Sequence, residues 1–108
     1  MRSPTWRAVL DLVARGKVKI SNHAFEELAA DGILATDVVE GARDAKVIED
    51  YPDYPKGPCV LVLQRDSGGE PVHVVWGIPR GSSTPAVVVT VYRPDSRWWK
   101  PDFKRRMP

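Results

Sequence analysis

The sequence predicts an α+β fold in which N-terminal helices pack on a four-stranded antiparallel sheet. In the first half of the chain, apolar residues recur at helical spacing behind residues that cap helices. The second half holds short runs rich in β-branched residues, joined by turns rich in glycine and proline. Short turns favour antiparallel neighbours. Because helices and strands segregate along the chain, we expect one α+β domain over residues 1–108.

Three helices are expected, in order. Ser3 caps the first, the second starts after Ser21 or Asn22 and stops at Gly32, and Thr36 caps the third. The side chains expected to be buried are Trp6, Val9, Leu10 and Val13, then Ala24, Phe25, Leu28 and Ala29, and finally Val38, Val39 and Ala42.

Four strands are expected after the helices. They are the runs KVIEDY, CVLVLQRD, PVHVVWGIP and AVVVTVYRP, and SGGE forms a hairpin turn between the second and the third. The segment KVKIS between the first two helices reads as a short connector, with extended structure left open.

Composition bounds the class of protein. The chain is 43% hydrophobic and 28% charged, with a net charge of +2, which is typical of a globular domain. Its apolar runs are too short to cross a bilayer, and its N-terminus does not read as a signal peptide, so cytoplasmic residence is expected. The single cysteine, Cys59, excludes an internal disulfide and reads as a small buried residue. No cofactor and no metal ion are expected.

The C-terminal end is basic and aromatic. From Arg93 onward, six cations face two acids, which suits a surface that contacts phosphates, although a solvated tail remains open. Trp98 and Trp99 are adjacent and cannot both face the core from one regular strand, so one is expected to be exposed and able to stack on bases.

His23 lies near the start of the second helix, and Glu26 and Glu27 follow it by three and four positions. Such spacing places both carboxylates on the face of His23, where one of them can orient the imidazole for acid–base chemistry. A solvated helix surface gives the same pattern.

His73 lies among valines in an expected strand. In the next expected strand, Thr90 and Tyr92 share a face, and the register of the hairpin decides whether His73 lies beside them. That register would produce a polar patch of imidazole, hydroxyl and phenol, while the alternative is a core histidine with one hydrogen bond.

Several segments together resemble a known family. SNHAFEELAADGI, GARDAKVIEDYP, PVHVVWGI, VTVYRPD and WWKPDFKRR follow the order of motifs in domain-of-unknown-function family 4258, over roughly residues 19–106. The family pattern runs HAxERM, RGI, a D-V pair, a Y-P turn, HVV, T-x-Y-x-P and a tryptophan with a trailing basic residue. This family looks related to RelE/ParE-like toxins, and more loosely to BrnT-type ribonuclease toxins. The resemblance implies N-terminal helices against an antiparallel sheet, RNA cleavage and an antitoxin partner.

The chain departs from the pattern at three positions. Glu27 stands where the family motif has arginine, Leu28 where it has methionine, and Asp31 where RGI has arginine. Two basic positions are therefore missing near the expected active face.

The leading hypothesis is a toxin-type endoribonuclease that uses metal-independent acid–base catalysis. His23, oriented by Glu26, would be the base, and His73 would be the acid, with Tyr92 as an alternative proton donor. The residues expected to bind substrate are Thr90, Arg93, Arg97, Trp98, Lys104, Arg105 and Arg106.

Two alternatives remain. One is a non-catalytic module that binds RNA or protein through the basic, aromatic end, with structural histidines. The other is an immunity or antitoxin-like protein whose sheet edge pairs with a partner strand. The expected partners are RNA or the ribosome, an antitoxin and a second copy of the chain; no membrane is expected.

Overall fold

The computed structural model describes residues 3–108. In chain order the elements are α1 (Pro4–Ala14), β1 (Val18–Ile20), α2 (Asn22–Asp31), α3 (Ala35–Gly41), the 3-10 turn η1 (Ala42–Asp44), β2 (Lys46–Tyr51), β3 (Cys59–Arg65), β4 (Pro71–Gly77) and β5 (Ala86–Tyr92). None of the helices in this part of the chain is both long enough and apolar enough to cross a membrane.

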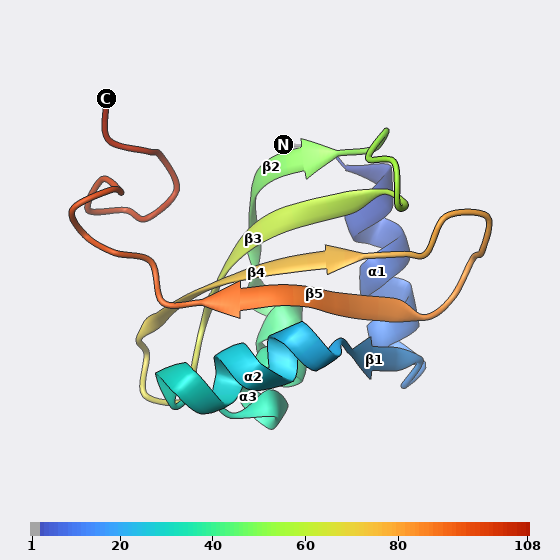
Figure 1. The fold of residues 1–108 in the computed structure, drawn as a ribbon, viewed down its shortest axis with the longest axis horizontal. Coiled ribbons are helices and arrows are strands. Elements are labelled where there is room, and N and C mark those ends of the chain that lie inside the picture. The colour runs from blue at the N-terminus through green and yellow to red at the C-terminus, as the bar shows by residue number, and fades with distance from the viewer. Residues whose placement is uncertain (1–2) are drawn as a thin grey trace.

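The sheet has five strands in the order β1-β5-β4-β3-β2 (Figure 1). β1 runs parallel to β5, and the other neighbours are antiparallel. The expectation of four antiparallel strands was therefore wrong at KVKIS. Val18–Ile20 pairs with Ala86–Val88, and backbone bonds from Ala86 to Lys17 and from Ser21 to Val88 extend the ladder. A three-residue strand stabilised by such a distant partner carries no periodic signal of its own.

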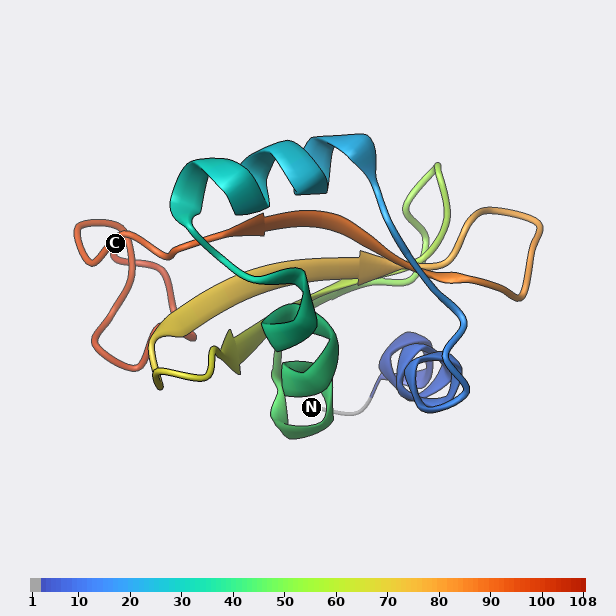
Figure 2. The ribbon, with the colours of Figure 1, turned by 90° about the horizontal axis from the view of Figure 1, so that it is seen from below.

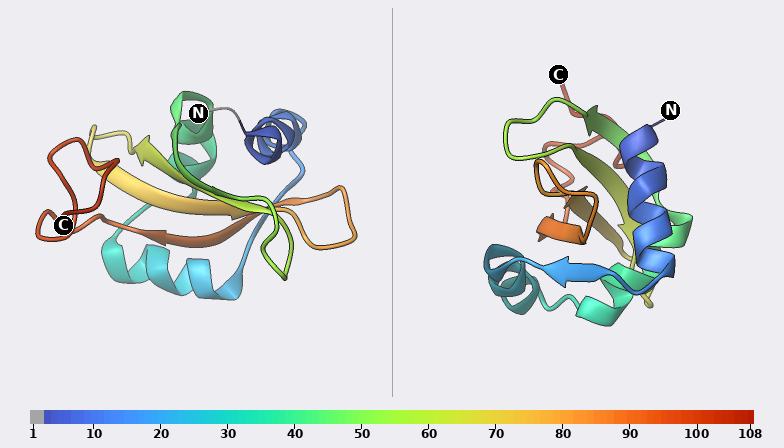
Figure 3. Two further views of the ribbon diagram at one scale, coloured as in Figure 1. Left: turned by 90° about the horizontal axis from the view of Figure 1, so that it is seen from above. Right: turned by 90° about the vertical axis from the view of Figure 1, so that its right-hand side faces the viewer.

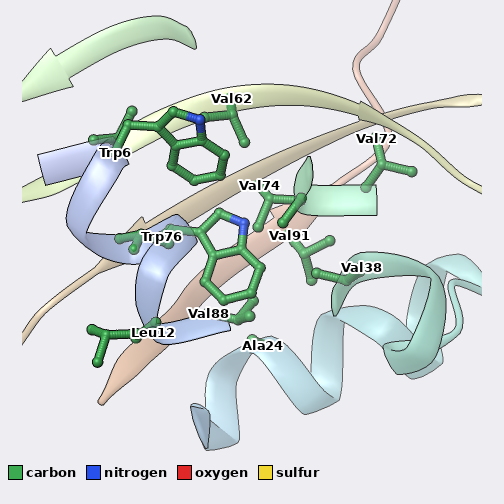
Figure 4. Close-up of a cluster of buried hydrophobic side chains, with 14 of the residues drawn as sticks. Trp6, Leu12, Ala24, Val38, Val62, Val72, Val74, Trp76, Val88 and Val91 are labelled. Atoms are coloured by element: carbon green, nitrogen blue, oxygen red, sulfur yellow. The ribbon is translucent and has the colours of Figure 1, made fainter. Parts of the chain in front are cut away.

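One face of the sheet forms the hydrophobic core. α1 and α3 cover this face, and α2 lies alongside β5 (Figure 2). Trp76 of β4 and Trp6 of α1 meet edge to face in the core, with ring centroids 6.4 Å apart (Figure 4). The fully or nearly fully buried strand residues of the cluster are Val60, Val62, Val72, Val74, Trp76, Ala86, Val88 and Val91.

The helix faces were predicted in part. Trp6, Val9, Ala24, Leu28, Val38 and Ala42 are buried as expected, Leu10, Val13 and Val39 are half-buried, and Leu12 is a core residue that the prediction lacked. The expected burial of Phe25 and Ala29 was wrong, because Phe25 is 53% exposed and Ala29 is also on the surface. α2 packs mainly against β5, and its buried residues form a single stripe through Ala24 and Leu28.

The opposite face, here called the second face, is covered differently. Directly paired residues of antiparallel strands point to the same face, which places Leu63, His73 and Tyr92 together on it. Residues 93–108, here called the C-terminal segment, follow β5 and loop around the end of the sheet where β5 stops and β4 begins (Figure 3). This segment covers His73.

Candidate functional site

His73 and Tyr92 are cross-strand neighbours on the second face. The Tyr92 hydroxyl lies 3.1 Å from His73 Nδ1, and His73 Nε2 lies 2.7 Å from the carbonyl oxygen of Phe103. A carbonyl only accepts, so Nε2 carries the proton and Nδ1 accepts from the phenol. Both ring nitrogens of a neutral imidazole are thereby used. The register left open by the sequence is the one that joins His73 to Tyr92.

The His73 ring is closed off from solvent. Its exposed fraction is 0%, and Trp99 meets it edge to face with centroids 4.3 Å apart. Burial lowers the pKa of His73, against the raising effect of its bond to the Phe103 carbonyl. A neutral, enclosed imidazole with both nitrogens bonded is poorly suited to give a proton to a substrate.

The C-terminal segment is held by a second group of contacts. Arg106 forms an ion pair with Glu49 of β2 and stacks over Trp99, with its guanidinium carbon 4.8 Å from the ring centre. The hydrogen bond from Arg106 lowers the pKa of Glu49, and Tyr51 lowers it further. Phe103, which supplies the carbonyl to His73, has a φ of 58°, a value that non-glycine residues seldom adopt. These contacts anchor a closed loop on the second face.

His23 lies elsewhere, on the exposed side of α2. The carboxylate near it is that of Glu27, with Oε1 3.3 Å from His23 Nε2, while Glu26 is exposed. Glu27 Oε1 also accepts from the Thr90 hydroxyl and, at 3.0 Å, from the Val91 amide. β1 pairs with β5 only over Ala86–Val88, so the Val91 amide has no neighbouring strand to accept its hydrogen bond. Glu27 supplies that acceptor.

Asp31 repeats this contact one helical turn further on. Its Oδ2 accepts from the Arg93 amide at 3.4 Å. The amides of Val91 in β5 and of Arg93, the residue directly after β5, thus meet carboxylates four residues apart on α2. Glu27 and Asp31 are two of the positions where the chain departs from the family pattern, and both dock α2 on the sheet.

Replacing Glu27 by alanine is expected to lower the free energy of unfolding by about 1 to 3 kcal/mol, because a part-buried amide and a hydroxyl lose their acceptor. Glu26→Ala is the matched control, since Glu26 is exposed and should change stability by less than about 0.5 kcal/mol. Urea unfolding of both variants measures the difference. Equal stabilities of the two variants would contradict the edge contact.

The two imidazoles do not form one pocket. His23 is on the exposed surface of α2, whereas His73 is enclosed beneath the C-terminal segment. Within the described part of the chain, residues 3–108, no hydrogen bond or ion pair links the two imidazoles. The expected arrangement of His23 as base, Glu26 as its orienting group and His73 as acid is therefore not what the structure assembles.

All four of the expected phosphate-binding arginines have carboxylate partners, including Arg106 with Glu49 described above. Arg93 pairs with Asp66 at 2.8 Å and donates to the Pro71 carbonyl, which ties β5 to the β3–β4 hairpin. Arg97 pairs with Asp95 and Arg105 with Asp102, both on the surface. The residues of the expected binding set that remain well exposed are Arg97, Trp98, Lys104, Arg105 and Arg106.

Trp98 and Trp99 divide as the sequence predicted. Trp99 is buried against His73, whereas Trp98 is 65% exposed, with the Arg97 guanidinium 6.0 Å from its ring centre. An exposed indole next to a cation is therefore presented on the outer side of the C-terminal segment. Cys59 is buried as expected, and burial raises the pKa of its thiol.

The docked segment is expected to lose stability as the pH falls below 6.5, the ordinary pKa of histidine. Because the folded-state pKa of His73 is lowered, the unfolded chain binds more protons in this range, and stability declines by at most about 1.4 kcal/mol per pH unit. Urea unfolding at about pH 7.5 and about pH 5.5 measures this slope. His73→Phe should flatten the slope between these values, and an unchanged slope in that variant would contradict the assignment.

No sequence pattern pointed to two residues near Arg106 on the second face. Glu49 and Tyr51 lie in an ordinary strand pattern, and only the pairing of β2 with β3 brings them to the second face. Residues 3–108 contain no group of three or more histidine, cysteine, aspartate or glutamate side chains arranged to hold a metal ion.

The fold and the site define an α+β domain with a helix-covered core face and a second face closed at one end by its own C-terminal segment. The chain belongs to the family described as "Domain of unknown function (DUF4258)", whose model matches residues 20–93. The match ends at Arg93, so most of the C-terminal segment lies outside it, although the resemblance noted above extends to residue 106. No curated protein and no solved structure matches the chain.

Proposed function

We propose that the chain is a non-catalytic RNA-binding module that contacts single-stranded RNA through its C-terminal segment. The observation that carries this proposal is Trp98, a large aromatic ring that is 65% exposed beside Arg97. Aromatic rings of this kind stack on unpaired bases, and neighbouring cations contact the phosphates.

Charge on the same segment supports the proposal. Lys100 and Lys104 make no ion pair among the described residues, and the ion pairs of Arg97 and Arg105 lie at the surface. Surface ion pairs contribute little, roughly 0 to 1 kcal/mol each, so an RNA phosphate can replace the carboxylate. In this proposal His73 positions the binding segment, and Glu49 does so through Arg106.

The wider proposal is that this family is related to RelE/ParE-like toxins. Helices on one sheet face and a basic C-terminal end agree with such a relationship, which remains an analogy of fold. Under this proposal the protein acts in the cytoplasm as part of a toxin–antitoxin pair, and an antitoxin or a second copy of the chain joins RNA or the ribosome as a partner.

Endoribonuclease activity is the second candidate. Glu49, Tyr51, Tyr92 and Arg106 bring a carboxylate, two phenols and a guanidinium together on the second face, and each is only partly buried or exposed. Such groups suit proton transfer and phosphate binding without a metal ion. This candidate no longer needs His23 or a proton from His73, which would instead orient Tyr92.

Trp98→Ala is expected to weaken RNA binding roughly 5- to 150-fold, which corresponds to the loss of one stacked base. Fluorescence anisotropy of a labelled single-stranded RNA measures the dissociation constant, and gel analysis of the same samples, with and without chelator, shows whether the RNA is cut. Phe25→Ala is the matched control, because Phe25 is 53% exposed on α2.

Affinity should also fall steeply with salt, by roughly 0.7 logarithmic units per phosphate contact for each tenfold rise in salt concentration. Equal losses in the Trp98 and Phe25 variants would refute the proposed surface. Cleavage that survives chelation, and is lost in Tyr92→Phe, would favour the second candidate.

A further inference from the structure

The second face carries an apolar hollow at the end that the C-terminal segment does not cover. Its volume is about 320 Å³, within the range of small-molecule sites. The floor is formed by Cys59, Gly77, Val87 and Val89, of which Gly77 pairs directly with Cys59 and Val87. A bulge in β5 between Val88 and Thr90 changes the alternation and brings Val87 to this face.

Two loops form rigid walls around the hollow. The Arg80 amide donates to the Lys56 carbonyl at 3.0 Å, and the Ile78 amide donates to the Pro58 carbonyl at 3.1 Å. Gly57 has a φ of 127°, and a Cβ at this position would lie 2.1 Å from the Ile78 carbonyl oxygen. Only glycine permits this close approach, so the walls are fixed before any ligand arrives.

The lining combines exposed apolar surface with a single sign of charge. Tyr54 and Val89, which line the hollow, are large apolar residues with exposed side chains, at 52% and 40% exposure. Lys56 is the one charged residue among those lining the hollow. Arg80 lies on the surface nearby, three residues after the end of β4. Neither cation forms an ion pair among residues 3–108. The Cys59 thiol, whose pKa is raised by burial, adds a neutral floor.

We propose that this hollow binds a small ligand with a flat apolar ring and one anionic group. The ring lies on Val87, Val89 and Gly77, and the anion faces Lys56. A hollow of this size holds a ring system and little more, which favours a small molecule over a protein segment. The inference does not depend on RNA binding, because the hollow and the C-terminal segment occupy opposite ends of the second face.

The test is an NMR titration of the full ¹⁵N-labelled chain with 2-naphthoate, and with 2-naphthylmethanol as the uncharged analogue. We expect a roughly millimolar dissociation constant, since a ligand of about thirteen non-hydrogen atoms reaches no more at ordinary ligand efficiency. Lys56→Ala should weaken naphthoate binding roughly two- to fivefold and leave the alcohol unchanged. Lys17→Ala, an exposed lysine between α1 and β1, is the matched control.

Saturable shifts confined to the Gly57, Gly77 and Val87 region, lost in Val89→Glu, support the site. Shifts that do not saturate, that centre on the C-terminal segment, or that are equally strong in the Lys56→Ala variant overturn it. Shifts of the same amides on simple concentration of the unliganded protein assign the surface to a second copy of the chain and also overturn it.

Discussion

Replacing His73 by phenylalanine is expected to lower the free energy of unfolding by about 2 to 4 kcal/mol and to release the C-terminal segment from the sheet. Phenylalanine keeps a planar ring between Tyr92 and Trp99 but cannot donate to the Phe103 carbonyl or accept from the Tyr92 hydroxyl. The Tyr92 hydroxyl and the Phe103 carbonyl then lose their hydrogen-bond partner. The position of the His73 ring is closed to water, so water cannot take the place of the imidazole.

Two measurements separate the effects of this substitution. Urea unfolding gives the stability. Limited trypsin digestion reports whether the segment is released, because the bonds after Arg97, Lys104 and Arg105 become easier to cleave once it leaves the sheet. His23→Phe is the control, since His23 lies on the surface of α2 and should change neither result. A His73 variant as stable and as resistant as the wild type would show that the segment is held without the imidazole.

The second large effect is expected at Trp76. This side chain is fully buried, contacts Trp6 edge to face and donates from Nε1 to Gln64 Oε1 at 2.8 Å. Gln64 in turn donates to the Val38 carbonyl at 2.8 Å, which joins α3 to the sheet. Trp76→Ala leaves a large cavity and an unpaired buried amide oxygen, and should cost at least about 4 kcal/mol.

Such a loss is a large share of the roughly 5 to 15 kcal/mol that stabilises an ordinary domain. Thermal and urea unfolding measure it, and Trp98→Ala serves as a control of the same residue type at an exposed position. Similar stabilities for the two tryptophan variants would mean that the core is not organised around Trp76.

The elements with strong local signals were predicted well. Ser3 caps α1, with its hydroxyl accepting from the Trp6 amide, and Ser21 caps α2 in the same way. The four longer strands appear where β-branched runs predicted them. The division between Trp98 and Trp99 followed from a simple geometric constraint on adjacent residues.

The parts that failed depend on contacts between distant residues. Helical spacing allowed His23 to face Glu26 or Glu27, and the position of the β5 edge decides for Glu27. Burial of His73 depends on Phe103, thirty residues away, in a segment with no periodic pattern. Glu49 and Arg106 are further apart still, and nothing in either local sequence announces their pairing.

The most direct test of RNA binding by the C-terminal segment is an NMR titration of the ¹⁵N-labelled chain with single-stranded RNA. We expect the signals of the Trp98 indole and of the amides of the C-terminal segment to shift together and to saturate with one dissociation constant, while the signals of α1 and α3 stay unchanged. Saturable shifts located on another surface, with the Trp98 indole unmoved, would contradict the claim that this segment is the RNA-binding surface.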